Sequence, residues 1–233
     1  MIDKTVDINH IFEEDEIKLL KDMGWNRSIA VQYHNEYDKE KFDKAKEYGE
    51  KHGLEIYCGI KIKTDSSKDL TKAIKRFRNK ADVLLVEGGI VKINRKALES
   101  HEVDILSTPE LNRNDNGIDH ILARLGSTHR VAIELNLNSL LEKKYYERAR
   151  LLWSFRRNIF LARKYDTPVV ISSGAKDIYG IKSPNDLRSF LNTLIDPIYS
   201  KKIMETTNKI LDYRIYLKKN NVVRYGIEIV KEE

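Results

Sequence analysis

Residues 117–136 read Gly-Ile-Asp-His-Ile-Leu-Ala-Arg-Leu-Gly-Ser-Thr-His-Arg-Val-Ala-Ile-Glu-Leu-Asn, and they predict a helix that leads directly into a buried strand. Four apolar residues share one helix face, which we expect to be buried: Ile118, Ile121, Leu122 and Leu125. The strand at 131–135 shows no alternation, as expected for a parallel strand covered on both faces. His120 and Arg124 share a helix face. Glu134 and Asn136 point to the same side of the strand.

The same change from strand to helix recurs along the whole chain. Strands are expected at 4–9, 28–33, 54–62, 82–87, 103–106, 131–135 and 167–174, and helices at 38–52, 67–79, 94–100, 141–164, 183–193 and 199–219. Seven or eight such units predict an α/β fold, a TIM-like (β/α) barrel of mostly parallel strands. The last unit is irregular, because two helices precede a candidate eighth strand at 222–230. We find no repeat or linker and expect one domain over residues 1–233.

Composition narrows the class of protein. Hydrophobic residues make up 41% and charged residues 33% of the chain, which fits a globular protein with a core. The net charge of +6 permits a polyanionic partner, although a Lys-rich, heat-adapted proteome explains it equally well. Cys58 is the single cysteine, which suits a reducing cytoplasm. No apolar run approaches the roughly 20 residues of a membrane helix, and no signal peptide is recognisable, so we expect a cytoplasmic protein without membrane association.

In a barrel of this kind, functional side chains lie at the C-terminal ends of the strands. These ends carry polar residues: Asp7, Asn9, Gln32, His34, Lys61, Lys63, Glu87, Thr108, Glu134, Asn136, Ser172 and Ser173. No H-x-H, H-E-x-x-H or cysteine pair is present, whereas a hydrolytic metal site needs several convergent ligands. A metal-dependent phosphoesterase that uses Asp7, Glu87 and Glu134 is nevertheless an alternative. The simpler interpretation is that these carboxylates are hydrogen-bonded at the rim.

The basic residues indicate more about function than the candidate catalytic acids and bases do. Lys143, Arg150, Arg157 and Lys164 recur every seven residues on the longest predicted helix, and others lie near the loop at 107–117, which has almost nothing to bury. A solvated helix face explains any one cluster. We expect a surface with few aromatic residues. On such a surface, the basic clusters together favour contact with a phosphate backbone rather than base stacking.

Four segments in this order resemble a known family: 117–124, 131–136, 158–165 and 167–175. They are similar to the ribonuclease P subunits that include the archaeal protein component 3 and the thirty-kilodalton subunit of the eukaryotic enzyme. The resemblance implies a TIM-like barrel related to the polymerase-and-histidinol-phosphatase (PHP) metallohydrolases. Where those relatives carry an H-x-H pair after the first strand, this chain has Asp7-Ile8-Asn9, so the metal ligands look lost.

The resemblance also implies a function. The chain would be a protein subunit of ribonuclease P that pairs with a small protein subunit and stabilises the catalytic RNA during 5′-leader removal from precursor tRNA. Catalysis in that family belongs to the RNA, which carries the Mg²⁺, so we expect no catalytic residue, metal site or cofactor in the protein. The PHP-type phosphoesterase and a scaffold that contacts only the protein partner are the competing interpretations.

Nine residues are predicted to contact RNA. His120 and Arg124 come from the block that carries the resemblance, although a purely structural histidine is an equally good interpretation of His120. The others are chosen by loop position and charge. The full set is Arg95, Arg113, His120, Arg124, Arg130, Lys164, Lys176, Lys182 and Lys202.

Overall fold

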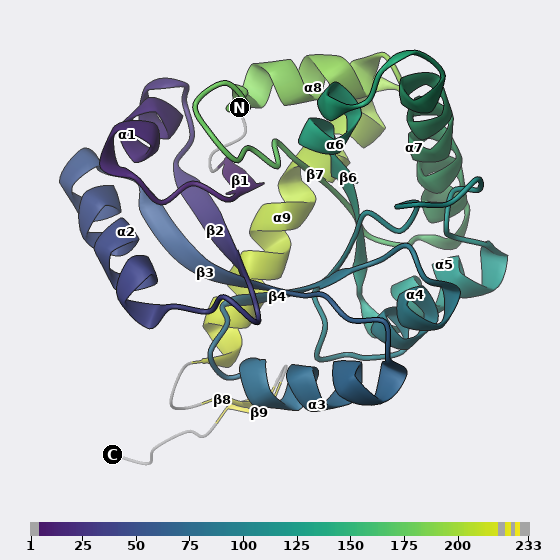
Figure 1. Ribbon diagram of the computed structural model, residues 1–233, viewed down its shortest axis with the longest axis horizontal. Coiled ribbons are helices and arrows are strands. Elements are labelled where there is room, and N and C mark those ends of the chain that lie inside the picture. The colour runs from purple at the N-terminus through teal and green to yellow at the C-terminus, as the bar shows by residue number, and fades with distance from the viewer. Residues whose placement is uncertain (1–4, 219–221, 225–226, 229–233) are drawn as a thin grey trace.

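A computed structural model describes residues 5–218, 222–224 and 227–228, and Figure 1 shows its ribbon. Seven strands pair in parallel in chain order: β1 (Val6–Asn9), β2 (Arg27–Tyr33), β3 (Glu55–Ile62), β4 (Val83–Glu87), β5 (Ile105–Ser107), β6 (Ala132–Asn136) and β7 (Val169–Ser172). The helices between them cover the outside of the sheet: α1 (Glu14–Asp22), α2 (Lys39–His52), α3 (Ser67–Phe77), α4 (Val91–Leu98), α5 (His120–His129), α6 (Leu137–Glu142), α7 (Tyr145–Tyr165) and α8 (Pro184–Asn192). The predicted TIM-like barrel is confirmed.

The barrel closes with seven strands. Where β1 meets the segment after β7, the Gly174 amide donates to the carbonyl of Ile8 (3.0 Å) and the His10 amide donates to the carbonyl of Ala175 (2.7 Å). Of the two alternatives, seven or eight strands, the structure shows seven, and the candidate strand at 222–230 does not join the barrel where it is described. There, β8 (Val222–Arg224) pairs with β9 (Ile227–Glu228) in a separate antiparallel sheet. Residues 225–226 and 229–230, like Lys4 of the first predicted strand, lie outside the described residues.

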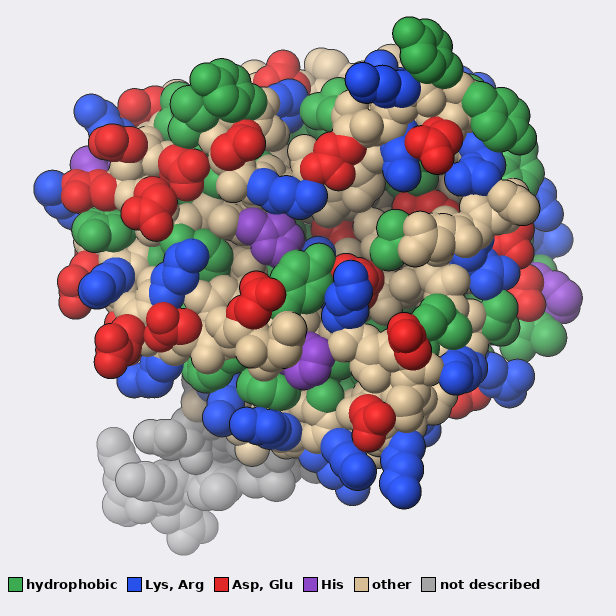
Figure 2. Space-filling model, in the orientation of Figure 1, with side chains coloured by type: hydrophobic (Ala, Val, Ile, Leu, Met, Phe, Trp, Pro, Cys, Tyr) green, Lys and Arg blue, Asp and Glu red, His purple; other side chains and the backbone are tan. Residues whose placement is uncertain are grey.

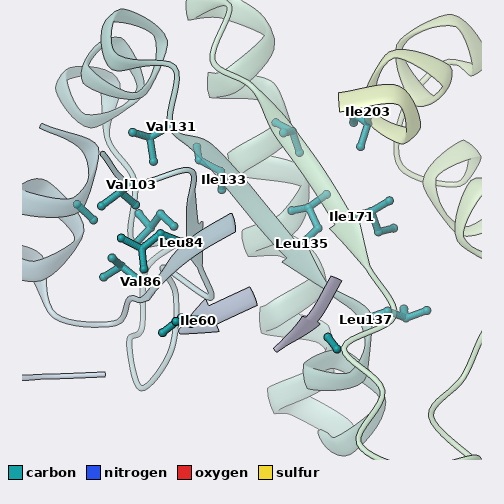
Figure 3. Close-up of a cluster of buried hydrophobic side chains, with 14 of the residues drawn as sticks. Ile60, Leu84, Val86, Val103, Val131, Ile133, Leu135, Leu137, Ile171 and Ile203 are labelled. Atoms are coloured by element: carbon teal, nitrogen blue, oxygen red, sulfur yellow. The ribbon is translucent and has the colours of Figure 1, made fainter. Parts of the chain in front are cut away.

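Strand residues alternate between two apolar layers. One set faces the barrel interior and forms its own cluster: Val6, Ile8, Ile29, Val31, Val83, Leu85, Ile105, Ala132 and Val170. The other set packs against the surrounding helices, as Ile60, Leu84, Val86, Ile133, Leu135 and Ile171 do in Figure 3. Because both faces of each strand are covered, the strands read as continuous apolar runs in the sequence.

Helix α9 (Pro197–Leu217) closes the end of the barrel at which the strands begin, and Figure 1 shows it crossing the sheet. Leu211 is buried in the interior cluster, with Ile210 and Ile215 packed beside it. The nearly buried Arg27 donates to Asp212 (2.6 Å) and to Glu55 (2.9 Å), which fixes the helix to β2 and β3. The irregular last unit is therefore a plug rather than another outer helix.

Two local expectations are wrong. The helix predicted at 141–164 is divided into α6 and α7, because the backbone is extended at Lys143 and Lys144 between them. Ile121 is 50% exposed, whereas we expected it to be buried with the rest of its stripe.

Among the helices of the described residues, none is apolar enough over sufficient length to cross a membrane.

The loop at 107–117 is also packed more firmly than its composition predicts. Asn94 donates through Nδ2 to the carbonyls of Pro109 and Gly117 (2.9 Å each), and Asn116 donates to Asn158 (2.7 Å). Gly117 adopts a φ of +71°, and a Cβ there would lie 2.0 Å from the Pro109 carbonyl oxygen. Buried amide side chains thus organise a loop that has few apolar residues.

We predict that Leu211→Ala lowers the free energy of unfolding by about 2–5 kcal/mol, because it leaves a cavity inside the barrel. Urea denaturation followed by circular dichroism measures this loss. Ile198→Ala on the same helix is the matched control, since Ile198 is 85% exposed and its truncation should change stability by no more than about 0.5 kcal/mol. Equal effects of the two substitutions would show that α9 does not plug the barrel.

Candidate nucleic-acid interface

A layer of polar side chains fills the barrel interior at the C-terminal ends of the strands. The Tyr33 hydroxyl donates to Glu87 (2.9 Å), and the Ser172 hydroxyl donates to the fully buried Glu134 (2.6 Å). The Asn136 amide donates to the same Glu134 oxygen (3.3 Å), which confirms that these two residues share a side of the strand. These hydrogen bonds link polar side chains of different strands inside the barrel.

Asp7 does not belong to this interior layer. It alternates with the inward-facing Val6 and Ile8, and its carboxylate accepts hydrogen bonds from the Asn9 amide (2.9 Å) and from the Ser173 backbone (2.8 Å). Burial raises the pKa of Asp7 to about 6, although the hydrogen bonds from Ser173 and Asn9 oppose the shift. The three carboxylates of the phosphoesterase interpretation are therefore not gathered at one place.

The donor chemistry also disagrees with the metal site of PHP enzymes. Asn9 uses its amide as a hydrogen-bond donor toward Asp7 and Ser28, so it offers no imidazole in place of the missing histidines. Within residues 5–218, 222–224 and 227–228, no group of three or more His, Cys, Asp or Glu side chains is arranged to hold a metal ion. The structure gives the phosphoesterase alternative no support.

Glu110 adds a further acid beside the barrel mouth. Burial raises the pKa of its carboxyl to about 8, and the nearby charge of Glu134 adds to the shift. One buried oxygen of Glu110 and one of Glu134 have no hydrogen-bond partner in the described part of the chain. Buried carboxyl oxygens therefore remain without partners at the mouth of the barrel.

The predicted RNA contacts fall into separate groups, of which one lies on neighbouring helices. Arg124 on α5 and Lys164 on α7 both lie over the ring of Tyr165, at 5.1 and 5.5 Å from its centre. His120 is exposed at the start of α5, and Arg95 is exposed on α4, where it pairs with Glu99. Figure 1 shows α4, α5 and α7 along one side of the barrel.

The other five predicted RNA contacts lie elsewhere on the protein or already bond to other groups of it. Arg113 forms two hydrogen bonds with Asp115 (2.6 Å each) in the packed loop. Lys176 pairs with Glu142 (2.8 Å), and Lys182 donates to two backbone carbonyls of its own loop. Arg130 and Lys202 line a cavity of about 850 Å³ at the opposite end of the barrel. The nine residues do not form a single surface.

Helix α7 carries basic residues that the predicted set left out. Its only acid is Glu147, against six basic side chains: Arg148, Arg150, Arg156, Arg157, Arg163 and Lys164. Arg163 pairs with Asp196 (2.8 Å), whereas no ion pair joins the other five to a carboxylate anywhere in the described residues. We call the set His120, Arg124, Arg150, Arg157 and Lys164 the α5–α7 basic surface. The seven-residue recurrence of Arg150, Arg157 and Lys164 was the sequence signal for it.

Aromatic side chains lie beside this surface. Tyr146 is 77% exposed, Trp153 52% and Phe160 56%, and all three are on α7. The expectation that the surface is poor in aromatic residues is therefore wrong for this helix. In Figure 2, hydrophobic and basic side chains lie next to one another at the upper right edge, where Figure 1 places α7. The signal missed in the sequence was the spacing of seven that these rings share.

We predict that Glu110→Gln stabilises the protein at alkaline pH but not at acidic pH. The raised pKa means that the folded state retains a proton that the unfolded chain releases, so the wild type loses stability as the pH rises from about 4.5 to about 8. Glutamine does not ionise, so the variant should gain on the order of a few kcal/mol at pH 9 and nothing at pH 4.5. Denaturation at both values measures the difference.

Glu47→Gln, on the exposed side of α2, is the matched control and should shift neither measurement. If wild type and Glu110→Gln lose stability in parallel across this range, the buried Glu110 carboxyl is not the group that titrates.

Comparison with known proteins agrees with the sequence resemblance. The family model for RNase P subunit p30 matches residues 3–219. Ribonuclease P protein component 3 of Methanococcus maripaludis is 65% identical over the whole of both chains, and that of Methanocaldococcus jannaschii is 58% identical over 98% of each. A chain in a cryo-EM structure of archaeal ribonuclease P with mature tRNA matches with a TM-score of 0.91 and 58% identity over 98% of this chain and 99% of its own.

A more distant likeness concerns the fold alone. The histidinol phosphate phosphatase of Lactococcus lactis, solved with zinc, L-histidinol and phosphate, matches with a TM-score of 0.52 at 8% identity, over 91% of this chain and 94% of its own. It agrees with the PHP-like barrel that the resemblance implied. The match of the family model over nearly the entire chain, together with relatives of this identity, shows that the chain belongs to the RNase P p30 subunit family.

Proposed function

We propose that this chain is a protein subunit of ribonuclease P that binds the RNA component and supports removal of the 5′ leader from precursor tRNA. The observation that carries the proposal is the match, at 58% identity and a TM-score of 0.91, to a chain of an archaeal ribonuclease P solved with tRNA. The α5–α7 basic surface supports it independently, because its lysine and arginines form no ion pair with a carboxylate in the described part of the chain. The resemblance implies catalysis by RNA, and we propose that Mg²⁺ is held by the RNA and not by this protein.

The proposed mechanism is electrostatic. Each lysine or arginine that lies on a phosphate releases condensed counterions and stabilises the folded RNA. If the active RNA conformer binds this surface better than the alternatives do, its population rises and less Mg²⁺ is needed. Arg124 and Lys164 are suited to this role, since both are exposed and both are held over the Tyr165 ring. The protein thereby acts on the RNA and not on the scissile bond.

A small protein subunit is the second proposed partner, as the resemblance implies. Exposed apolar side chains in the segment between β7 and α8, Ile178 and Tyr179, are available for such a contact away from α7. Precursor tRNA would be contacted indirectly through the assembled complex. We place this complex in the cytoplasm, in keeping with the single buried cysteine.

We predict that Arg124→Gln combined with Lys164→Gln weakens precursor tRNA cleavage at low Mg²⁺ in an enzyme reconstituted from the RNA, this chain and its partner subunit. Two lost phosphate contacts should raise the Mg²⁺ concentration needed for half-maximal cleavage several-fold, while high Mg²⁺ restores the rate. The measurement is a cleavage rate across a Mg²⁺ titration.

Lys201→Gln combined with Lys209→Gln is the matched control, because both lysines on α9 pair with Glu205. It removes the same charge and should leave the Mg²⁺ requirement near that of the wild type. Cleavage that does not depend on this chain at any Mg²⁺ concentration would refute the proposed function itself.

A further inference from the structure

We propose that the outer face of α7 is a binding site for single-stranded RNA, in which bases stack on Tyr146, Trp153 and Phe160 and phosphates lie on the neighbouring arginines. This inference rests on the proposed function and deepens it. It assigns a second kind of contact, base stacking, to a protein whose sequence indicated phosphate contact alone.

The three rings form one stripe. They are spaced by seven residues, which is about 10.5 Å along a helix and returns to nearly the same face. The buried residues of α7 are on the opposite side: Leu151, Phe155, Asn158, Ile159 and Ala162. No other element of the described chain covers the rings enough to bury them, since about half or more of each remains exposed. The stripe is thus the outermost line of the molecule along this helix.

Two of the rings follow a cation three residues earlier on α7: Arg150 precedes Trp153, and Arg157 precedes Phe160. Lys143, three residues before Tyr146, lies ahead of the helix and pairs with Glu147 (3.8 Å). Residues three apart on a helix are neighbours, with Cβ atoms about 5–6 Å from each other. The Arg157 guanidinium already lies over the Phe160 ring, 5.5 Å from its centre. A base on the ring and a phosphate of the same strand on the adjacent cation would satisfy both stripes at once.

Charge decides which partner fits. Arg150 and Arg157 have no carboxylate within ion-pair distance in the described residues, and Arg150 donates only to the neutral Asn114 (2.8 Å). The lysines of α9 show the contrasting pattern, since Lys201, Lys202 and Lys209 each pair with an acid. A face that leaves its cations unpaired suits a polyanion. Exposed rings beside those cations favour an unpaired strand over a duplex, whose bases are stacked inside and cannot reach a side-chain ring.

The intrinsic fluorescence of the chain reports on this site. Trp153 is half exposed, whereas Trp25, the other tryptophan, is 1% exposed. Titration of the full chain with a 20-nucleotide oligouridine should quench the Trp153 emission and protect it from acrylamide. A 20-base-pair RNA duplex should bind with little change in either signal. Emission that stays unchanged on saturation with oligouridine would overturn the inference.

Two sets of variants separate stacking from charge, with affinity measured by the anisotropy of labelled oligouridine. Trp153→Leu combined with Phe160→Leu should weaken binding by about tenfold per ring while the salt dependence is kept. Arg150→Gln combined with Arg157→Gln should reduce the slope of log affinity against log salt by about 0.7 for each charge. All four side chains are partly or fully exposed, so the variants should fold as the wild type does.

Tyr179→Leu is the control for loss of an exposed aromatic residue elsewhere, and it should bind as the wild type does. Equal affinities of Trp153→Leu/Phe160→Leu and Tyr179→Leu would refute stacking on α7. Poly-glutamate that protects Trp153 as well as oligouridine does would instead identify a docking face for an acidic protein. The reconstituted cleavage assay tests the proposed function separately. Cleavage that does not depend on this chain would refute the proposed function. If cleavage does depend on the chain but the α7 variants bind oligouridine as the wild type does, only the α7 site is refuted.

Discussion

The structure depends on how β1 and β7 meet without an eighth strand between them. Backbone hydrogen bonds from Gly174 and His10 join the two edges, and the buried Asp7 carboxylate accepts from both the amide and the hydroxyl of Ser173. Asn9 extends this network to Ser28 on β2. The Asp7-Ile8-Asn9 segment therefore helps to hold the barrel shut.

Closure in this way removes the usual site of a TIM-like barrel. The mouth is filled by its own polar side chains, Tyr33 with Glu87 and Ser172 with Glu134, and the buried Glu110 adds an acid whose raised pKa keeps it largely protonated below about pH 8. The opposite end is plugged by α9. A large polyanion can then meet this protein only on its outside, where no ion pair joins the lysine and arginines of the α5–α7 basic surface to an acid of the described chain.

Most of the fold could be predicted from the sequence, since both faces of each strand are buried and the apolar runs mark the strands directly. The division between α6 and α7 could not, because the extended backbone at Lys143 and Lys144 has no marker such as proline or glycine. The choice between seven and eight barrel strands stayed open, because closure of the barrel depends on hydrogen bonds between residues far apart in the chain. Of the predicted site, Arg124 and Lys164 come together in space, whereas Lys176 and Lys202 lie apart and are paired with acids. The exposure of Trp153 and Phe160 could not be predicted, because aromatic residues on a helix usually belong to its buried face.

The most direct test of RNA binding by the outer helices is ultraviolet crosslinking of the assembled RNA–protein complex, with the crosslinked peptides of this chain identified by mass spectrometry. The account predicts crosslinks in the segments 120–124 and 146–164. Crosslinks confined to the ends of the strands around the barrel mouth, with none on α5 or α7, would contradict it.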